Sequence, residues 1–293
     1  MASQSFSVES AVLQAEDEWT RHSCGFYACP TCKRDLEPSY DGLSCRVCAT
    51  TYPILSGIPD FIVVNLEESR NRSLLVVGKN DSRPLPDFLA SIYETWIYPY
   101  VCNLYGGSHS TSLKQLAHDV AGIVGSRDGV ILDVACGPGT YGRRIASASR
   151  TILGIDACMS MMRRGVQYVE SEHIPNVHFA CATVEALPFR AGLFDAAICA
   201  GSLNHFSDTV LALREINRTM KVGAPLAVMC FARINSGLMK YKWILDQAEK
   251  GGGHIDSVAD LERYVFEAGF EDFRPHAYGS VLVFSARKRP AEH

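Results

Sequence analysis

Two pairs of cysteines near the start of the chain have the spacing of metal ligands. Cys29 and Cys32 form one Cys-x-x-Cys pair, and Cys45 and Cys48 form a second pair further along. Each pair can place two thiolates on one turn, and four thiolates complete the tetrahedral coordination of structural zinc. Two disulfides or one redox-active pair are the alternatives, but two such pairs favour a metal in a reducing compartment. The pattern therefore predicts a structural Zn²⁺ site.

The remaining cysteines indicate the compartment. Cys24 lies outside the metal pattern, and the others are scattered singly through apolar segments, as free thiols are. These are Cys102, Cys136, Cys158, Cys181, Cys199 and Cys230. The chain starts with acids such as Glu9 and Glu16 instead of a basic, apolar leader, and no uncharged apolar run reaches about 18 residues. We therefore expect a cytoplasmic protein without a membrane span.

A second group of residues has the pattern of a nucleoside site. Small residues at Ala135, Gly137 and Gly139 follow an apolar segment and let the backbone turn sharply and approach a ligand. Asp156 follows the next apolar segment, where a carboxylate can accept hydrogen bonds from ribose hydroxyls. A dinucleotide is the alternative ligand, because dinucleotide enzymes also combine a glycine turn with a downstream acid. Asp133 at the start of this loop is better suited to a cationic amino group, so an amino-acid-bearing nucleoside is favoured.

The elements that must position these residues alternate regularly. Short apolar strands are expected near 130–135, 151–155, 177–181, 194–200 and 224–231. Helices should begin near Tyr141, Met159, Asp208 and Asp256, and a helix over about 112–125 should precede the first strand. Such alternation is typical of a parallel sheet built from right-handed βαβ units. Residues 271–287 are expected to add an antiparallel strand pair, and aromatic residues at helical spacing from Phe88 to Tyr100 predict a core-facing helix or a lid.

Length and composition suggest two folded units. The 293 residues are too many for one small core, and a hydrophobic content of 47% is enough to fill a large one. We expect an extension at 1–23, a metal-binding module at 24–62, a linker at 63–86 and a catalytic domain at 87–293. A module of about 40 residues buries too little apolar surface to fold alone, so the metal must stabilise it. Its last part should form a short strand with a turn at Ser56-Gly57.

Over residues 88–285 these motifs resemble class I S-adenosylmethionine-dependent methyltransferases of the UbiE type. The resemblance rests on Leu132–Thr140, Gly154–Asp156, Val184–Phe189, Phe194–Ala200 and Leu213–Ile216 with Lys221–Gly223. It implies an α/β fold, a Rossmann-like doubly wound sheet of seven strands, with S-adenosyl-L-methionine as cofactor. The preceding four-cysteine module is similar to the zinc-ribbon domains found with several methyltransferases.

The resemblance also implies which residues contact the cofactor. They are Asp133, Ala135, Gly137, Gly139, Asp156, Ala157, Met161, Thr183, Val184 and Ala200. Thr183 departs from the family, which often has an aspartate there to bind the adenine amino group. A hydroxyl is a poorer acceptor than a carboxylate, so cofactor binding should persist with lower affinity.

The loop after the fourth strand, Gly201–Phe206, should lie beside the methyl group to be transferred. His205 is the candidate general base, and a structural or adenine-side histidine is the alternative. Tyr93 and Asn204 are candidates to orient either ligand. Residues 232–254 should add an apolar and aromatic pocket for the methyl acceptor, or simply an extra packed helix.

These features lead to three hypotheses about function. The first is a methyltransferase that modifies O, N or C of a small apolar or aromatic metabolite. The second is an RNA base methyltransferase of the ribosomal RNA guanine type, since such enzymes also carry a zinc ribbon. A net charge of -4 and a ribbon with three Lys+Arg against four Asp+Glu provide a poor phosphate-binding surface. The third is a non-catalytic cofactor-binding or partner module.

Overall fold

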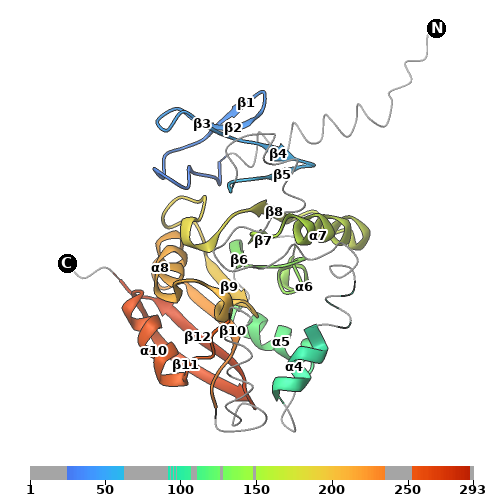
Figure 1. Ribbon diagram of the computed structural model, residues 1–293, viewed down its shortest axis with the longest axis vertical. Helices are drawn as coiled ribbons and strands as arrows, with labels where there is room; N and C mark the ends of the chain where they lie inside the picture. Colours follow the sequence, from blue (N-terminus) through green and yellow to red (C-terminus); the bar gives the residue numbers. More distant parts are fainter. Residues whose placement is uncertain are drawn as a thin grey trace.

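The computed structural model describes residues 25–62, 92, 94, 96, 98–106, 111–125, 128–147, 150–234 and 253–290. A small β module lies against a larger α/β unit (Figure 1). The predicted extension and linker fall outside the described residues, so the four domain boundaries remain predictions. Among the helices that are described, none is both long and apolar enough to cross a bilayer.

The small module consists of two antiparallel units. Strands β1 (Glu37–Ser39), β2 (Gly42–Cys45) and β3 (Thr50–Tyr52) form a sheet in that order. They are followed by a hairpin of β4 (Ile54–Leu55) and β5 (Ile58–Pro59). Its turn is at Ser56 and Gly57, as expected, and both have positive φ, 52° and 76°. Two left-handed residues give the type I′ turn that fits the twist of a two-residue hairpin.

A sheet of seven strands forms the centre of the described α/β unit, in the order β11-β12-β10-β9-β6-β7-β8. The strands are β6 (Gly129–Val134), β7 (Arg150–Asp156), β8 (Val177–Cys181), β9 (Ala196–Ala200), β10 (Pro225–Phe231), β11 (Phe270–Tyr278) and β12 (Val281–Lys288). Strands β6 to β10 are parallel, and β12 is antiparallel to both β10 and β11. The expected α/β fold class with a seven-stranded sheet is confirmed.

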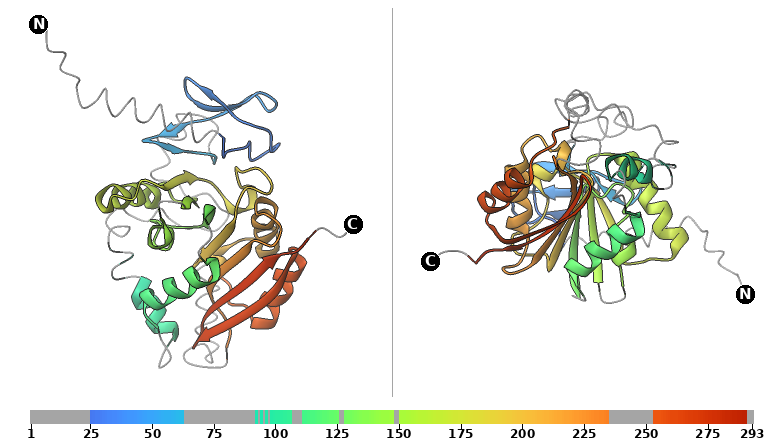
Figure 2. Two further views of the ribbon diagram at one scale, coloured as in Figure 1. Left: turned by 180° about the vertical axis from the view of Figure 1, so that it is seen from behind. Right: turned by 90° about the horizontal axis from the view of Figure 1, so that it is seen from below.

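Helices cover both faces of this sheet, as the right-hand view of Figure 2 shows. The helices are α4 (Tyr98–Gly106), α5 (Leu113–Val124), α6 (Gly142–Ile145), α7 (Met159–Glu172), α8 (Thr209–Thr219) and α10 (Val258–Glu267). Side chains of α4, α5 and α7 share one apolar core with the sheet, and those of α8 and α10 share the other. Every residue of β10 is buried, because this strand is covered on both faces.

Two helix starts illustrate why the sequence folds in this way locally. Asp208 accepts a hydrogen bond from the Leu211 N–H at the start of α8. Ser257 and Asp260 form a reciprocal capping box at the start of α10. These short polar side chains satisfy main-chain donors that have no partner inside the helix. Both starts lie within two residues of the predicted positions.

The aromatic helix expected from Phe88 to Tyr100 is only partly described. Trp96 and Tyr100 are exposed, which contradicts the core-facing alternative at these two residues, whereas Tyr98 is buried. The lid alternative remains a prediction. Glu94 and Trp96 have π-helical geometry directly before α4, so regular α-helical spacing does not hold through this segment.

Candidate cofactor and metal sites

The four predicted metal ligands lie together. All four Sγ atoms are within 4.8 Å of one another. Cys29 Sγ is 3.8 Å from Cys48 Sγ, and Cys32 Sγ is 3.5 Å from Cys45 Sγ. A tetrahedron with Zn–S bonds of about 2.3 Å has edges of about 3.8 Å, whereas a disulfide needs about 2.05 Å. The donor set therefore fits a four-coordinate metal.

Both cysteine pairs have the same backbone geometry. The residue after the second cysteine is left-handed in each pair: Lys33 has φ 60° and Ala49 has φ 52°. The Lys33 N–H donates to Cys29 O over 2.8 Å, and the Cys48 N–H approaches Cys45 Sγ at 3.4 Å. These turns direct both thiols of a pair toward one point.

The glycine loop between β6 and α6 has three residues with positive φ: Ala135 at 49°, Gly137 at 56° and Gly139 at 75°. A Cβ on Gly139 would lie 2.9 Å from the Phe179 ring, so this glycine lets the loop pack on the sheet. A Cβ on Gly137 would have no atom within 4 Å. Gly137 therefore faces open space, where a ligand can approach the main chain.

Asp156, at the end of β7, links this strand to the glycine loop that follows β6. Its Oδ2 accepts from the Gly137 N–H over 2.9 Å, and its Oδ1 accepts from the Cys158 N–H over 2.8 Å. A carboxylate has about four acceptor positions, so part of this capacity remains for ribose hydroxyls. Burial raises the pKa of Asp156, although these hydrogen bonds oppose the shift. The side chain is only half-buried and remains accessible to a ligand.

Asp133 lies deeper. It is 2% exposed, and its Oδ2 accepts from the Gly142 N–H over 2.9 Å. Burial and, to a smaller extent, the charge of Asp156 raise the pKa of Asp133 to about 7. The side chain thus holds the glycine loop against α6. Its contact with a cationic amino group remains a prediction, and such a group would favour the ionised carboxylate.

The loop after β8 lies next to Asp156. The Ala182 N–H donates to Asp156 O over 3.1 Å, which places Thr183 and Val184 at this end of the sheet. Val184 is buried, and Thr183 is half-buried at the start of the short helix η4 (Val184–Ala186). The loop therefore meets the glycine loop at the carboxyl ends of β6, β7 and β8, where α/β proteins bind ligands.

The remaining predicted cofactor residues surround the same region. Ala157 is exposed directly after Asp156, Met161 is buried in α7, and Ala200 is half-buried at the end of β9. The Ser202 hydroxyl donates to Ala135 O over 3.3 Å and so joins the loop after β9 to the glycine loop. The structure brings all the described candidates to one edge of the sheet.

Of the three catalytic candidates, Tyr93 lies outside the described residues. His205 ends the short helix η5 (Leu203–His205) after β9, and its side chain is exposed. Surrounding protein atoms lower the pKa of His205 by desolvation, and the positive charge of His254 adds to the effect. A lowered pKa keeps the imidazole neutral near pH 7, which is the form that accepts a proton.

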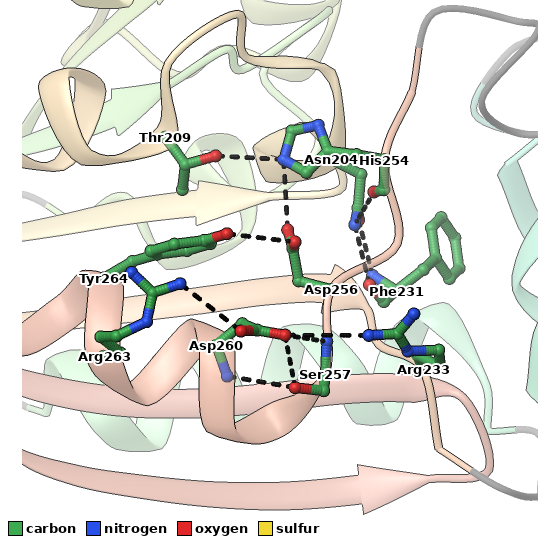
Figure 3. Close-up of polar contacts among 10 residues, drawn as sticks. All are labelled: Asn204, Thr209, Phe231, Arg233, His254, Asp256, Ser257, Asp260, Arg263 and Tyr264. Carbon is green, nitrogen blue, oxygen red and sulfur yellow. Dashed lines mark hydrogen bonds and ion pairs between the residues drawn. The ribbon is translucent and has the colours of Figure 1, made fainter.

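Asn204 holds the loop in place (Figure 3). Its Nδ2 donates to Phe231 O and to His254 O, both over 2.8 Å. Its Oδ1 accepts from the Phe231 N–H, also over 2.8 Å. Both amide hydrogens are used by main-chain groups, so the structure gives Asn204 the task of joining η5 to the end of β10. A direct contact between Asn204 and a ligand remains a prediction.

Sequence reasoning missed the polar cluster around Asp256 (Figure 3). His254 Nε2 lies 3.2 Å from Asp256 Oδ2 and 3.1 Å from Thr209 Oγ1. The Tyr264 hydroxyl donates to Asp256 Oδ1 over 3.4 Å. The cluster links α8 and α10 and fixes His254 beside η5. No local sequence motif predicts this cluster, because its members come from separate elements.

Tyr98 was also missed. Its hydroxyl is 2.7 Å from that of Tyr141, and both rings are buried. A Cβ on Gly201 would lie 3.1 Å from the Tyr98 ring, so Tyr98 packs against the loop after β9. The aromatic-rich segment was the available signal, but the α-helical spacing assumed for it does not hold at Glu94 and Trp96, which are π-helical. Of the predicted acceptor-pocket segment 232–254, residues 235–252 lie outside the described residues.

Comparison with known proteins adds to this geometry. A family model described as a methyltransferase domain matches residues 131–223. The mitochondrial 2-methoxy-6-polyprenyl-1,4-benzoquinol methylase of Leishmania donovani is 30% identical over 156 residues, 47% of this chain and 53% of that protein. A ubiquinone/menaquinone biosynthesis C-methyltransferase UbiE of a Geobacter species is 34% identical over 169 residues, 50% of this chain and 72% of that protein. The match spans about half the length of the Leishmania protein.

A solved structure shows the same fold. Phosphoethanolamine N-methyltransferase 2 of Haemonchus contortus, in complex with S-adenosyl-L-methionine, superposes with a TM-score of 0.55 at 15% identity. The superposition covers 70% of this chain and 60% of that chain.

Proposed function

This chain belongs to the class I S-adenosylmethionine-dependent methyltransferases, which transfer a methyl group, and its relatives act on small molecules. We propose that it methylates a ring carbon of an apolar, aromatic acceptor of the quinol type. The observation that carries this proposal is the 34% identity to a quinone-biosynthesis C-methyltransferase over 72% of that protein. The matched relatives are named for small-molecule acceptors, so the RNA and non-catalytic hypotheses gain no support.

The described residues fit the cofactor. S-adenosylmethionine supplies an electrophilic methyl group on a sulfonium. Asp156 keeps acceptor capacity for the ribose hydroxyls, and Gly137 offers open space beside its main chain. Asp133 holds the glycine loop in shape, and in our proposal Thr183 and Val184 border the adenine. The site thus binds and orients the cofactor, which is the main requirement for methyl transfer.

A proton must leave a quinol-type acceptor so that electron density reaches the ring carbon that is methylated. In our proposal the neutral His205 imidazole accepts the hydroxyl proton, and the ring carbon then takes the methyl group. The hydrogen of that carbon leaves as a proton, which restores the aromatic ring and its hydroxyl, and the exposed His205 returns the net proton to solvent. Asn204 acts by positioning, since its amide fixes η5 and therefore His205. Tyr98 supports the same loop from the other side at Gly201.

The four-cysteine site is proposed to hold structural Zn²⁺. The Sγ separations of 3.5 and 3.8 Å support this assignment, because they match a thiolate tetrahedron. With four protein ligands no coordination position is left for a substrate, so the metal stabilises the ribbon. Paired cysteines that bind a metal and further cysteines scattered singly are typical of proteins in a reducing compartment, so we propose a cytoplasmic location.

Methyl-labelled cofactor tests the proposal. The full-length enzyme is incubated with a short-tailed benzoquinol or naphthoquinol that lacks one ring methyl group, and the product is analysed by mass spectrometry and NMR. We expect label on a ring carbon. Label on oxygen alone would overturn the carbon assignment, and transfer only to RNA would overturn the substrate class.

A further inference from the structure

The ribbon holds the loop after β8 at both ends. The Phe61 N–H donates to Cys181 O over 2.8 Å, where the chain leaving β5 lies alongside the end of β8. The Ala28 N–H donates to Pro188 O over 2.9 Å. Residues 182–187, which include Thr183, lie between these two main-chain bonds. Their ends are therefore fixed by a module that precedes them by more than a hundred residues.

A side chain of the ribbon strengthens the second contact. Lys33 Nζ donates to Leu187 O over 3.3 Å and to Glu215 Oε2 over 2.9 Å. The same Glu215 oxygen accepts from the Leu187 N–H over 3.1 Å. Burial opposes ionisation of Glu215, but hydrogen bonds from Arg218 and Lys33 hold its pKa below the ordinary value. Both main-chain groups of Leu187 are thus bound to one charged, partly buried pair.

The metal site determines where these contacts lie. Ala28 precedes Cys29 directly, and Lys33 follows Cys32 directly. The Lys33 N–H donates to Cys29 O, and the Cys29 N–H donates to Arg34 O, both over 2.8 Å. The turn that places the first two thiols is therefore the turn that positions both loop-binding groups. Without a metal, no bond holds the four thiols to one point, and this turn loses that constraint.

Aromatic packing makes the connection rigid. The Tyr27 ring lies 5.6 Å from Phe189 and 5.1 Å from Phe61, between centroids, and Phe189 lies 4.9 Å from Phe194 under the sheet. Ribbon and sheet residues belong to one continuous buried core. The left-hand view of Figure 2 shows the ribbon resting on this part of the α/β unit. A close-packed core transmits displacement, so the ribbon cannot move without moving the loop.

We propose that the zinc-loaded ribbon is a positioning element for the cofactor loop: the first cysteine pair and Lys33 hold residues 182–187 beside Asp156, and loss of the metal lowers the affinity for S-adenosylmethionine. The inference rests on the proposed zinc site and on the proposed cofactor role of Thr183 and Val184. It adds that the two sites are energetically coupled.

The first test compares two substitutions of ribbon cations in the full chain. Lys33→Ala removes the contact to Leu187, whereas Arg46→Ala removes a surface cation paired with the exposed Glu37. By calorimetry, Lys33→Ala should raise the Kd for S-adenosylhomocysteine by about tenfold, since it deletes a charge-assisted contact. Arg46→Ala should leave the Kd within about twofold. Lys33→Arg should restore most of the affinity.

Two readouts separate positioning from general destabilisation. Amide hydrogen exchange should accelerate at residues 182–189 in Lys33→Ala. The urea concentration at which the central sheet is half unfolded should stay unchanged. If Lys33→Ala does not fold, Lys33→Met, which keeps the apolar stem, provides the Kd. An equal Kd in the Lys33 and Arg46 variants would overturn the inference.

Metal removal is the second test. Chelation of the full-length protein should raise the Kd for S-adenosylhomocysteine at least about tenfold, and added Zn²⁺ should reverse the change. An unchanged Kd in chelated protein with intact circular dichroism would overturn the inference. Wild-type, zinc-loaded protein that binds no S-adenosylhomocysteine would instead contradict the proposed function.

Discussion

At the scale of single residues, Asp156 should determine cofactor affinity most directly. Asp156→Ala should weaken S-adenosylmethionine binding by about 1.5–3 kcal/mol, because a charge-assisted acceptor for the ribose is lost. Titration calorimetry measures the change, and Asp272→Ala, which removes an exposed acid on β11, is the control. Unchanged affinity in a folded Asp156 variant would mean that another group binds the ribose.

His205 has a separable role. His205→Ala should lower turnover by about 10²–10⁴-fold and leave cofactor affinity nearly unchanged, because it removes a proton acceptor and no cofactor contact. Its pKa is lowered, so the neutral base is present above that pKa and is lost on acidification. The acidic limb of the wild-type pH profile should therefore lie below about pH 6.5.

His118→Ala is the matched control, since His118 is an exposed histidine on α5. Near-normal turnover of His205→Ala would exclude a general base at this position. Joint loss of stability and cofactor binding would instead assign His205 a structural role.

At the scale of elements, the loop from β6 to α6 depends on Gly139. Gly139→Ala should lower the free energy of unfolding of the cofactor-free protein by about 2–4 kcal/mol, because strain at φ 75° adds to a clash with Phe179. Gly192→Ala is the control for strain alone: its φ is 66°, and its Cβ would have no atom within 4 Å. It should cost about 1–2 kcal/mol. Urea unfolding measures both, and equal losses would argue against the clash.

Comparison of predicted and observed elements shows which of them the sequence patterns specify. The five parallel strands lie within about two residues of their predicted positions, because apolar runs bounded by turn residues specify buried strands locally. The aromatic segment before α5 was less predictable. Tyr98 is buried and Trp96 exposed, since the π-helical geometry at Glu94 and Trp96 changes the spacing of residues that share one face.

At the scale of the whole molecule, we expect about one Zn²⁺ per chain, bound with Zn–S distances of about 2.3 Å. Cys29→Ser and Cys48→Ser should lower stability, because the ribbon and the sheet share one core. Cys158→Ser, which changes a half-buried thiol away from the cluster, should have little effect. Metal analysis, X-ray absorption and thermal unfolding provide the measurements. Freshly reduced protein that contains no zinc would contradict this assignment.

The sequence by itself determined the structural features that depend on short stretches of chain. The cysteine pairs, the glycine loop and Asp156 could be recognised because knuckle turns, positive φ and strand-end acids are local requirements. Only the tertiary structure decided which side chains support them. Lys33 reaches Leu187 across 154 positions, and Asn204 reaches the main chain of His254 across 50. Such contacts form between elements after the chain has folded, so no local pattern encodes them.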